Sequence, residues 1–365
     1  MKKILAMILA LCMVFALCAC GQQAAPAAPA EEAAPAAEEA PVEEAPVEEA
    51  APVEEPAAAA EYKLGMGITV STDSSTDGNA QVDATVAAVV VDENGVIVKC
   101  AIDAVQNKMD VTEGTVDTEK TFKTKMELGD DYNMVKFSDA THEWYDQAAA
   151  FAEYAVGKTA DEVASTELKV NEEGHNVVVD ETLYASCSIS VEDFIEAIVK
   201  ACNDPGAQSF IADEFQLGVA AISTAEESTD ATDEEDGVVK MYSDFGAVAV
   251  SDGKVLAAVT DAIQPQIAYD KDGVIGETTF KGTKRELGDD YNMVKFGNAI
   301  AEWYAQAQAF CDFVKGMTAD EILGLETVVN EEGNAVSTDA ALLAGCTMSI
   351  SGMQAVLATA IGYAK

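Results

Sequence analysis

Apolar runs on either side of a turn predict the first elements of the fold. The runs 84–91 and 96–102 are rich in Val, Ala and Ile, and a DENG sequence at 92–95 separates them. Two such runs joined by a short turn that contains Asn-Gly are typical of a β-hairpin. The pattern recurs over 246–259, where an SDG sequence forms the turn. The sequence therefore predicts two antiparallel hairpins.

Helical periodicity follows each hairpin. A helix is predicted over 140–156, with Asp139 as its N-cap and Asn298 at the equivalent place later in the chain. Its apolar positions lie at i, i+4, i+7 and i+11, on one face of the helix, and are Trp144, Ala148, Phe151 and Ala155. The sequence TADE, at 159–162 and again at 318–321, has the form of a capping box and predicts a short second helix in each copy.

A short strand and a third helix complete the predicted unit. The strand is placed around 185–190, and the helix after it turns Phe194, Ile198 and Ala201 inward. The predicted order is β-β-α-α-β-α, which favours the α+β class. We therefore expect two homologous α+β domains, each a small antiparallel sheet with packed helices.

An internal repeat gives the domain organisation. The residues ELGDDYNMVKF occur at 127–137 and again at 286–296, and the two copies then align without gaps at an offset of 159. Other matching segments are EWYDQA with EWYAQA, GKTADEV with GMTADEI, NEEG with NEEG, and ASCSIS with AGCTMS. Each copy is large enough to fold alone, so we expect two domains, 62–204 and 215–365, and not a solenoid.

The N-terminus has the pattern of a secretion signal. Lys2 and Lys3 precede an apolar run at 4–17, which is too short to span a bilayer comfortably. The run ends in Leu-Cys-Ala-Cys-Gly at 17–21. This segment resembles the lipobox of bacterial lipoproteins, which implies a signal peptide at 1–19 and a diacylglyceryl group on Cys20. We therefore expect a protein anchored by lipid to the extracellular face of the cell membrane.

Residues 20–61 carry the predicted anchor and a stalk. From 22 to 60 the chain is almost entirely Ala, Pro, Glu and Val, and it has no basic residue there. Such a composition builds no core and favours a disordered or polyproline-II conformation. At about 3.1 Å per residue, the stalk would reach on the order of 100 Å and hold the folded part away from the membrane.

Charge and side-chain chemistry narrow the function classes. The formal net charge is −44, with 65 acidic and 21 basic residues. A surface of this sign repels nucleic acid, so we expect no nucleic-acid partner. With His142 and His175 as the only histidines, and with no CxxC motif, a zinc site or a His-based triad is disfavoured. No nucleophile–base pair recurs in both copies, so an enzyme is the less favoured class.

Ser188 and Thr347 occupy equivalent positions in the two copies, each at the end of a run of small residues before a helix. Small residues let a ligand approach the backbone, and a helix N-terminus offers free N–H groups to a phosphate. The simpler interpretation is structural: Ser190 and Ser349 cap the helices, and the small residues pack beneath them. Both interpretations stay open.

The stretch AGCTMS at 344–349, followed by an apolar helix, resembles the S-G-A-T-x-S signature of FMN-binding domains. That family includes flavin subunits of the sodium-pumping NADH:quinone oxidoreductase and tandem-domain surface lipoproteins of extracellular electron transfer. In the family, the motif threonine carries FMN through a phosphoester. The resemblance implies FMN on Thr347, with Ser188 as a weaker equivalent. The sequence departs from the signature at Cys346, where the family has alanine, and at Ser186, where it has glycine.

The duplicated GDDY segment is a second candidate site. Its aspartates are able to ligate calcium, or to contact a ligand together with the tyrosine, but adjacent aspartates in a loop are more often turn formers or caps. The residues are Asp130, Asp131 and Tyr132 in the first copy and Asp289, Asp290 and Tyr291 in the second. The Trp-Tyr pairs at 144–145 and 303–304 also have two interpretations: they stack on a ligand, or they pack in the core. Cys187 and Cys346, which are equivalent, are either redox-active thiols or small buried side chains.

Together these features predict a surface lipoprotein with two homologous ligand-binding modules, and the repeated segments resemble repeat lipoproteins of clostridia. One hypothesis is that the modules carry FMN for extracellular electron transfer. The alternative is a non-redox binding or structural protein that recognises a small ligand, a divalent cation or a cell-wall polymer. A solute-binding transport protein would use two different lobes around a cleft, and near-identical repeats argue against it.

Overall fold

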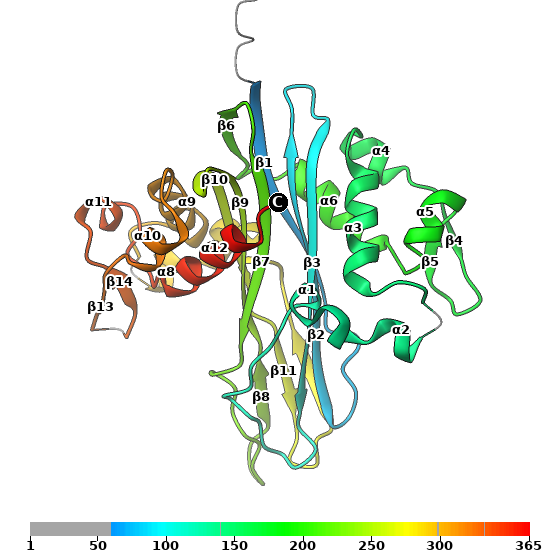
Figure 1. The fold of residues 1–365 in the computed structure, drawn as a ribbon. Coiled ribbons are helices and arrows are strands. Elements are labelled where there is room, and N and C mark those ends of the chain that lie inside the picture. Colours follow the sequence, from blue (N-terminus) through cyan, green and yellow to red (C-terminus); the bar gives the residue numbers. More distant parts are fainter. Residues whose placement is uncertain (1–59, 139, 298, 332) are drawn as a thin grey trace, which may run out of the picture. The chain divides into compact units, whose positions relative to one another are not determined.

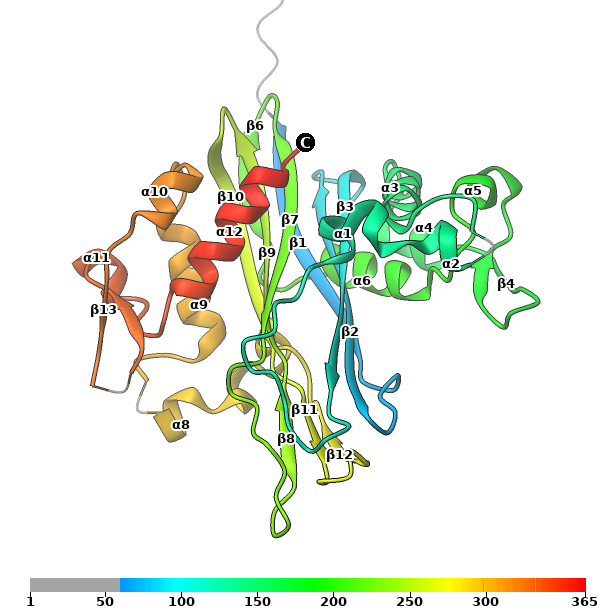
Figure 2. The ribbon, with the colours of Figure 1, turned by 60° about the horizontal axis from the view of Figure 1, so that its bottom comes forward.

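Two layers of β-strands pack face to face at the centre of the fold, and helices cover the outer face of each layer (Figures 1 and 2). The computed structural model describes residues 60–365, apart from 139, 298 and 332. The predicted signal peptide, Cys20 and the stalk up to residue 59 lie outside the described residues, as do Asp139 and Asn298. We call 60–202 half one, 216–365 half two and 203–215 the connecting segment.

Half one runs from strands to helices. Its strands are β1 (Ala60–Ser71), β2 (Asn79–Val91), β3 (Ile97–Asp110), β4 (Leu168–Val170) and β5 (Asn176–Val178). Its helices are α1 (Lys125–Leu128), the 3₁₀ helix η1 (Gly129–Tyr132), α2 (Met134–Phe137), α3 (Trp144–Ala155), α4 (Ala160–Ala164), α5 (Glu181–Ser186) and α6 (Glu192–Cys202). Strand β6 (Gln208–Ala212) of the connecting segment pairs antiparallel with β1, which gives the sheet order β3-β2-β1-β6.

Half two repeats this series of elements. Its strands are β7 (Gln216–Thr224), β8 (Gly237–Lys240), β9 (Tyr242–Ser251), β10 (Lys254–Ile263), β11 (Gln266–Tyr269), β12 (Ile275–Thr279), β13 (Thr327–Val329) and β14 (Ala335–Ser337). Its helices are α7 (Lys284–Leu287), the 3₁₀ helix η2 (Gly288–Tyr291), α8 (Met293–Gly297), α9 (Trp303–Phe313), α10 (Ala319–Leu323), α11 (Ala340–Leu343) and α12 (Ser351–Tyr363). The larger strands form two sheets, β10-β9-β7 and β12-β11-β8.

A proline explains why half two has two three-stranded sheets where half one has a single continuous one. Asp103 pairs with Val86, and Asp261 pairs with Phe245, so the long strand β3 corresponds to β10 and β11 together. Pro265 lies between β10 and β11 and has no N–H to donate to a ladder. The strand is therefore interrupted in half two and continuous in half one.

Strand β2 is buried on both faces, which explains its almost continuous apolar sequence. Successive residues of a strand point to opposite sides. Ala84, Val86 and Val90 therefore join the core between the two layers of strands, whereas Ala87 and Val89 pack against the helices of half one.

The central core is built by both halves. Leu64 and Val86 from half one pack in one cluster with Phe245 and Tyr269 from half two. Two separate outer cores lie under the helices, one beneath α3 and α6 and the other beneath α9 and α12. Because the central core is shared, each half buries its inner sheet face against the other half.

The structure confirms the α+β class, with antiparallel sheets and packed helices in each half. Both predicted hairpins are present, as β2–β3 and β9–β10. The apolar stripe of α3 is buried, and both capping boxes form, at Thr159 and at Thr318. Within the described part of the chain, no helix combines the length and the hydropathy that a membrane crossing requires.

Two predicted element positions are wrong. Helix α3 begins at Trp144 and not at 140, with Glu143 as its N-cap. The Glu143 carboxylate instead accepts the N–H groups of Met134 at 2.8 Å and Val135 at 3.3 Å, so it joins α2 to the start of α3. The expected strand at 185–190 is replaced by the end of α5, which Asp180 caps, and by an irregular segment.

Candidate functional site

Ser188 and Thr347 are held in the same way in the two halves. The N–H of Ser188 donates to Gln147 Oε1 at 2.8 Å, and the N–H of Thr347 donates to Gln306 Oε1 at 2.8 Å. The two hydroxyls lie 3.4 and 3.3 Å from the same oxygens. Both glutamines are buried, and each amide nitrogen also donates to a backbone carbonyl just before its own helix. The repeated glutamine therefore clamps the hydroxyl segment to α3 or α9.

Ser190 and Ser349 do not cap the helices that follow them, so that part of the structural interpretation is wrong. The N-caps of α6 and α12 are Val191 and Ile350, and neither makes a side-chain capping hydrogen bond. The small residues do pack tightly, because Cys187 and Cys346 are fully buried.

Burial also makes these two thiols poor nucleophiles. It raises the pKa of Cys187 to about 12 and that of Cys346 to about 11. Since the thiolate is the reactive form of cysteine, both side chains are unreactive at neutral pH.

The hydroxyl segments border a pocket in each half. The pocket at Ser188 has a volume of about 700 Å³, and the pocket at Thr347 one of about 340 Å³. Their equivalent lining residues are Met134 and Met293, Asn171 and Asn330, Glu172 and Glu331, His175 and Asn334, and Ser188 and Thr347. The two pockets therefore repeat in position and, for most residues, in chemistry.

Exposed apolar side chains accompany the pockets. Phe137 on α2 is 77% exposed, and Phe296 on α8 is 76% exposed. Both short helices begin with a methionine that lines the pocket of its half, Met134 or Met293. Val135 and Val294 on the same helices are each 45% exposed, so each half presents an apolar patch at the same place, and such a patch is typical of a contact surface.

The GDDY segments form the 3₁₀ helices η1 and η2, and their aspartates are used locally. Asp130 accepts a hydrogen bond from the Tyr145 hydroxyl at 3.0 Å, and Asp289 accepts one from the Tyr304 hydroxyl at 3.2 Å. The backbone carbonyls of Asp131 and Asp290 each accept a bond from the asparagine two residues later. None of these four aspartates lines either pocket.

A lysine enclosed by aromatic rings occurs in each half, and the sequence reasoning missed it; Lys125 lines the pocket at Ser188, whereas Lys284 does not line the pocket at Thr347. Lys125 Nζ lies 5.0 Å from the ring centroid of Tyr132 and 5.3 Å from that of Trp144. Lys284 Nζ lies 5.0 Å from Tyr291 and 5.4 Å from Trp303. These are cation–π distances. The available signal was a lysine two positions before the duplicated ELGDDY segment in both copies.

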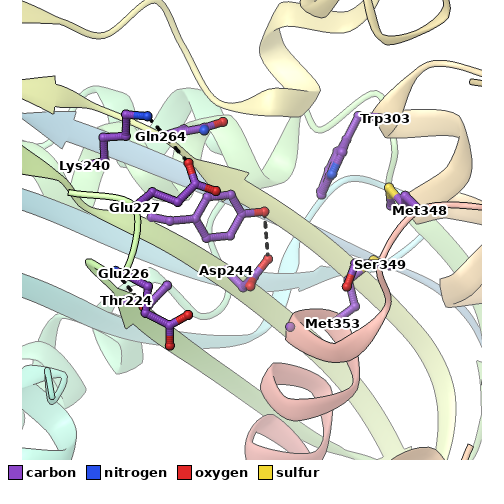
Figure 3. Close-up of a pocket in the computed structure, with 12 residues that line it drawn as sticks. Thr224, Glu226, Glu227, Lys240, Asp244, Gln264, Trp303, Met348, Ser349 and Met353 are labelled. Carbon is purple, nitrogen blue, oxygen red and sulfur yellow. Dashed lines mark hydrogen bonds and ion pairs between the residues drawn. The ribbon is translucent and has the colours of Figure 1, made fainter. Parts of the chain in front are cut away.

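Half two has a further cavity, of about 230 Å³, which Met348 lines together with Asp244, Trp303 and Ser349 (Figure 3). Lys284 Nζ donates to the Tyr242 hydroxyl at 3.1 Å, and this hydroxyl donates to Asp244 Oδ1 at 3.3 Å. Burial raises the pKa of Asp244 to about 6, against the opposing effects of the Lys284 charge and the Tyr242 hydrogen bond.

Half one places a carboxylate near its enclosed lysine from a different element. Asp193 on α6 has its pKa raised by burial, and the charge of Lys125 opposes that shift. The position of Asp193 is taken by Gly352 in half two, where any side chain would collide with Asp244. The carboxylate therefore comes from the helix in half one and from strand β9 in half two.

Each half also buries a carboxylate beneath its first short helix. Asp103 accepts the N–H of Met126 at 3.2 Å, and Asp261 accepts the N–H of Arg285 at 3.0 Å. Burial raises the pKa of Asp103 to about 7 and that of Asp261 to about 6, with the hydrogen bonds opposing it in both cases. The positive charge of Arg285 further lowers the pKa of Asp261, and half one has the uncharged Met126 at that place.

Comparisons with known proteins identify no relative of this chain. No family model matches the sequence, and neither a curated protein nor a solved structure gives a significant match. Over the part of the chain that the structure describes, no group of three or more His, Cys, Asp or Glu side chains is arranged to hold a metal ion. The candidate site is therefore defined by its geometry and by its repetition in the two halves.

Proposed function

We propose that the chain is a cell-surface lipoprotein whose two halves bind a polyhydroxylated ligand, such as a glycan strand of the cell wall. One observation carries the proposal: equivalent residues line a pocket at Ser188 and a pocket at Thr347. Carboxamide, carboxylate and hydroxyl groups supply the donors and acceptors that sugar hydroxyls need. Phe137 and Phe296 supply an exposed apolar surface beside them.

The paired arrangement suits a polymer better than a small solute. The two sites lie on opposite outer faces of the fold (Figure 1), so one chain can contact two strands of a cross-linked polymer, and the second contact then takes place within the same complex. The predicted Cys20 anchor and stalk would hold both sites within reach of the wall. The mature protein should begin at Cys20 and carry a diacylglyceryl group there by mass spectrometry, and an unmodified Cys20 would contradict the anchor.

The binding proposal is tested by co-sedimentation of the full chain with purified peptidoglycan. Phe137→Ser and Phe296→Ser should each weaken binding because avidity is lost, and the double variant should weaken it on the order of a hundredfold because both sites are impaired. Both side chains are exposed, so the melting temperature should stay constant. Leu323→Ser, at an exposed residue that lines neither pocket, is the matched control. Unchanged sedimentation of the double variant would refute the proposal.

Covalent FMN is a second candidate, because the Thr347 hydroxyl borders a pocket, but the lining there does not fit a phosphate. The residues lining that pocket include Glu331 and no Lys, Arg or His. The N–H of Thr347 is already bonded to Gln306. The pocket at Ser188 includes Lys125 and His175 but also Glu172 and Glu173, and the N–H of Ser188 is likewise bonded, to Gln147. Neither lining is positively charged overall, and only the pocket at Ser188 places a lysine beside the hydroxyl, whereas the motif favours Thr347.

The flavin candidate has a direct test. The chain is purified from its native source, its visible absorption spectrum is recorded, and peptides that contain Ser188 or Thr347 are weighed by mass spectrometry. A flavin spectrum and a peptide heavier by one phosphoester-linked FMN would support it. Colourless protein with unmodified peptides would remove it and leave the glycan proposal untouched.

A further inference from the structure

The largest of the described cavities lies at the junction of the two halves, away from the pockets at Ser188 and Thr347. It is a groove of about 810 Å³ between strand β3 and helix α3 of half one and strand β7 of half two, with Tyr363 and Lys365 at one side. Its walls include Ala101, Met126, Ala149, Val156 and Val219. This volume is typical of small-molecule sites, which are mostly apolar with a few polar groups.

The connecting segment fills the equivalent junction on the other side of the fold. There, Arg285 donates to the carbonyl oxygen of Gly206 at 3.3 Å and lies 3.9 Å from the Asp204 carboxylate. Lys315 donates to Gln208 Oε1 at 2.9 Å, at the start of β6. Polar and charged side chains of half two therefore hold this extended segment in place.

The open groove has apolar residues at the positions of Arg285 and Lys315, which hold the connecting segment in half two, and of Gln308, which accepts a hydrogen bond from Arg285. Met126, Ala149 and Val156 stand where half two has Arg285, Gln308 and Lys315. Val156 is 42% exposed, which is unfavourable for an isolated valine in water. The open groove is thus suited to an apolar occupant, and the filled one to the polar chain that occupies it.

The strand that borders the open groove carries a lysine where the equivalent strand of half two has alanine. Lys99 on β3 lines the groove, and its Nζ lies 3.4 Å from the backbone oxygen of Lys365. The equivalent residue on β10 is Ala257. Of the two carboxylates that also line the groove, Glu127 accepts a hydrogen bond from the Tyr363 hydroxyl at 3.2 Å, and Glu153 is exposed to solvent.

We propose that this groove binds a linear amphiphile with an aliphatic chain and an acidic head group, such as a fatty acid. The aliphatic chain lies along Met126, Ala149 and Val156, and the head group pairs with Lys99. The size of the cavity, the three polar-to-apolar differences between the halves and the lysine on β3 support this class of ligand. The inference does not depend on the proposed glycan sites.

The test is calorimetric titration of the full chain with octanoate, decanoate and dodecanoate, all below their critical micelle concentrations. Each added methylene should tighten binding roughly fourfold, until the groove is full. Ala149→Gln combined with Val156→Lys introduces the residues of half two at two exposed positions, and it should weaken dodecanoate binding tenfold or more. Lys99→Ala should weaken it severalfold.

Two controls separate this site from the rest of the molecule. Val294→Lys places a lysine at an exposed valine that does not line the groove, and it should leave dodecanoate binding unchanged. The Phe137→Ser, Phe296→Ser double variant should also bind dodecanoate normally, whatever its effect on peptidoglycan. The absence of binding heat at two well-separated temperatures, affinities that do not depend on chain length, or full binding by the groove variant would each overturn the proposal.

Discussion

Half one and half two share the order and placement of their helices and differ where they meet. The capping boxes, the glutamine clamps and the enclosed lysines recur in both halves. The differences are the strand break at Pro265, the element that supplies the carboxylate near the lysine, and the junction groove, filled in half two and open in half one. The repeated parts are therefore the helical surface with its pockets, and the diverged parts are the strand edges and the junction.

The strongest test of this comparison is whether the two halves unfold together. Phe245 is fully buried in the shared core, and Phe245→Ala should lower the free energy of unfolding by about 3–5 kcal/mol. Trp144 and Trp303 are the only tryptophans and lie in different halves, so Trp144→Phe and Trp303→Phe variants report on each half separately. Urea denaturation followed by fluorescence should give coincident midpoints, both shifted by Phe245→Ala. If only the Trp303 signal shifts, the halves are independent.

The next effect concerns the glutamine clamps. Gln147→Ala leaves the N–H of Ser188 without its acceptor, and Gln306→Ala does the same for Thr347. Each should cost about 1–3 kcal/mol of stability, with the larger loss where water reaches the freed group less easily. Chemical denaturation measures the cost, and NMR amide exchange at residues 188 and 347 shows whether the segment has opened. A loss of stability without faster exchange at these amides would contradict the clamp.

The buried carboxylates Asp103 and Asp261 should make the stability of the two halves depend on pH over different ranges. The pKa of Asp103 is raised from 3.8 to about 7 and that of Asp261 from 3.8 to about 6, so the folded state binds these protons more tightly than the unfolded state. Their contribution to stability is present below pH 4, and it is lost as the pH rises to about 7 for Asp103 and to about 6 for Asp261.

The free energy of unfolding should therefore fall less between pH 4 and about 7 in the Asp103→Asn variant than in the wild type. Asp261→Asn should have a smaller effect of the same kind, between pH 4 and about 6. Arg285→Met should raise the pKa of Asp261, because it removes the nearby positive charge. Carboxyl-carbon NMR titration measures the two pKa values. An unchanged Asp261 titration in the Arg285→Met variant would show that Arg285 is not the source of the difference.

The smallest expected effect is at the capping boxes. Thr159→Ala and Thr318→Ala each remove the side-chain acceptor for an N–H in the first turn of α4 or α10. Each should cost about 1 kcal/mol, and the two costs should agree because the geometry is the same in both halves. Thermal denaturation of the pair measures this. Clearly different stability costs for the two variants would show that the helices of the two halves have diverged more than their capping sequences indicate.

Local patterns in the sequence predicted the hairpins, the buried stripe of α3 and both capping boxes, because each depends on residues close together in the chain. The start of α3 was misplaced because Glu143 serves as its N-cap while its carboxylate binds backbone N–H groups of α2. The segment before α6 was misassigned because its conformation depends on Gln147, on another helix. Contacts of that kind leave no periodic pattern.

The candidate site was predictable only in part. The pairing of Ser188 with Thr347 was visible from the repeat, and both residues border pockets. The glutamines that hold them and the lysines enclosed by Tyr132 and Tyr291 required the fold, since only the tertiary structure brings these residues together. The junction groove was not predictable at all, because it is formed by strands from both halves.

The shared central core has a consequence for the origin of the chain. A single copy of this unit would expose the apolar inner face that carries Leu64 and Val86, and a second identical copy is the simplest partner to cover it. Such a pair would be a homodimer with an isologous interface. We infer that the present chain descends from a dimer whose subunits became fused. A fragment of residues 60–204 should accordingly associate in size-exclusion chromatography, and a soluble monomeric fragment would argue against that ancestry.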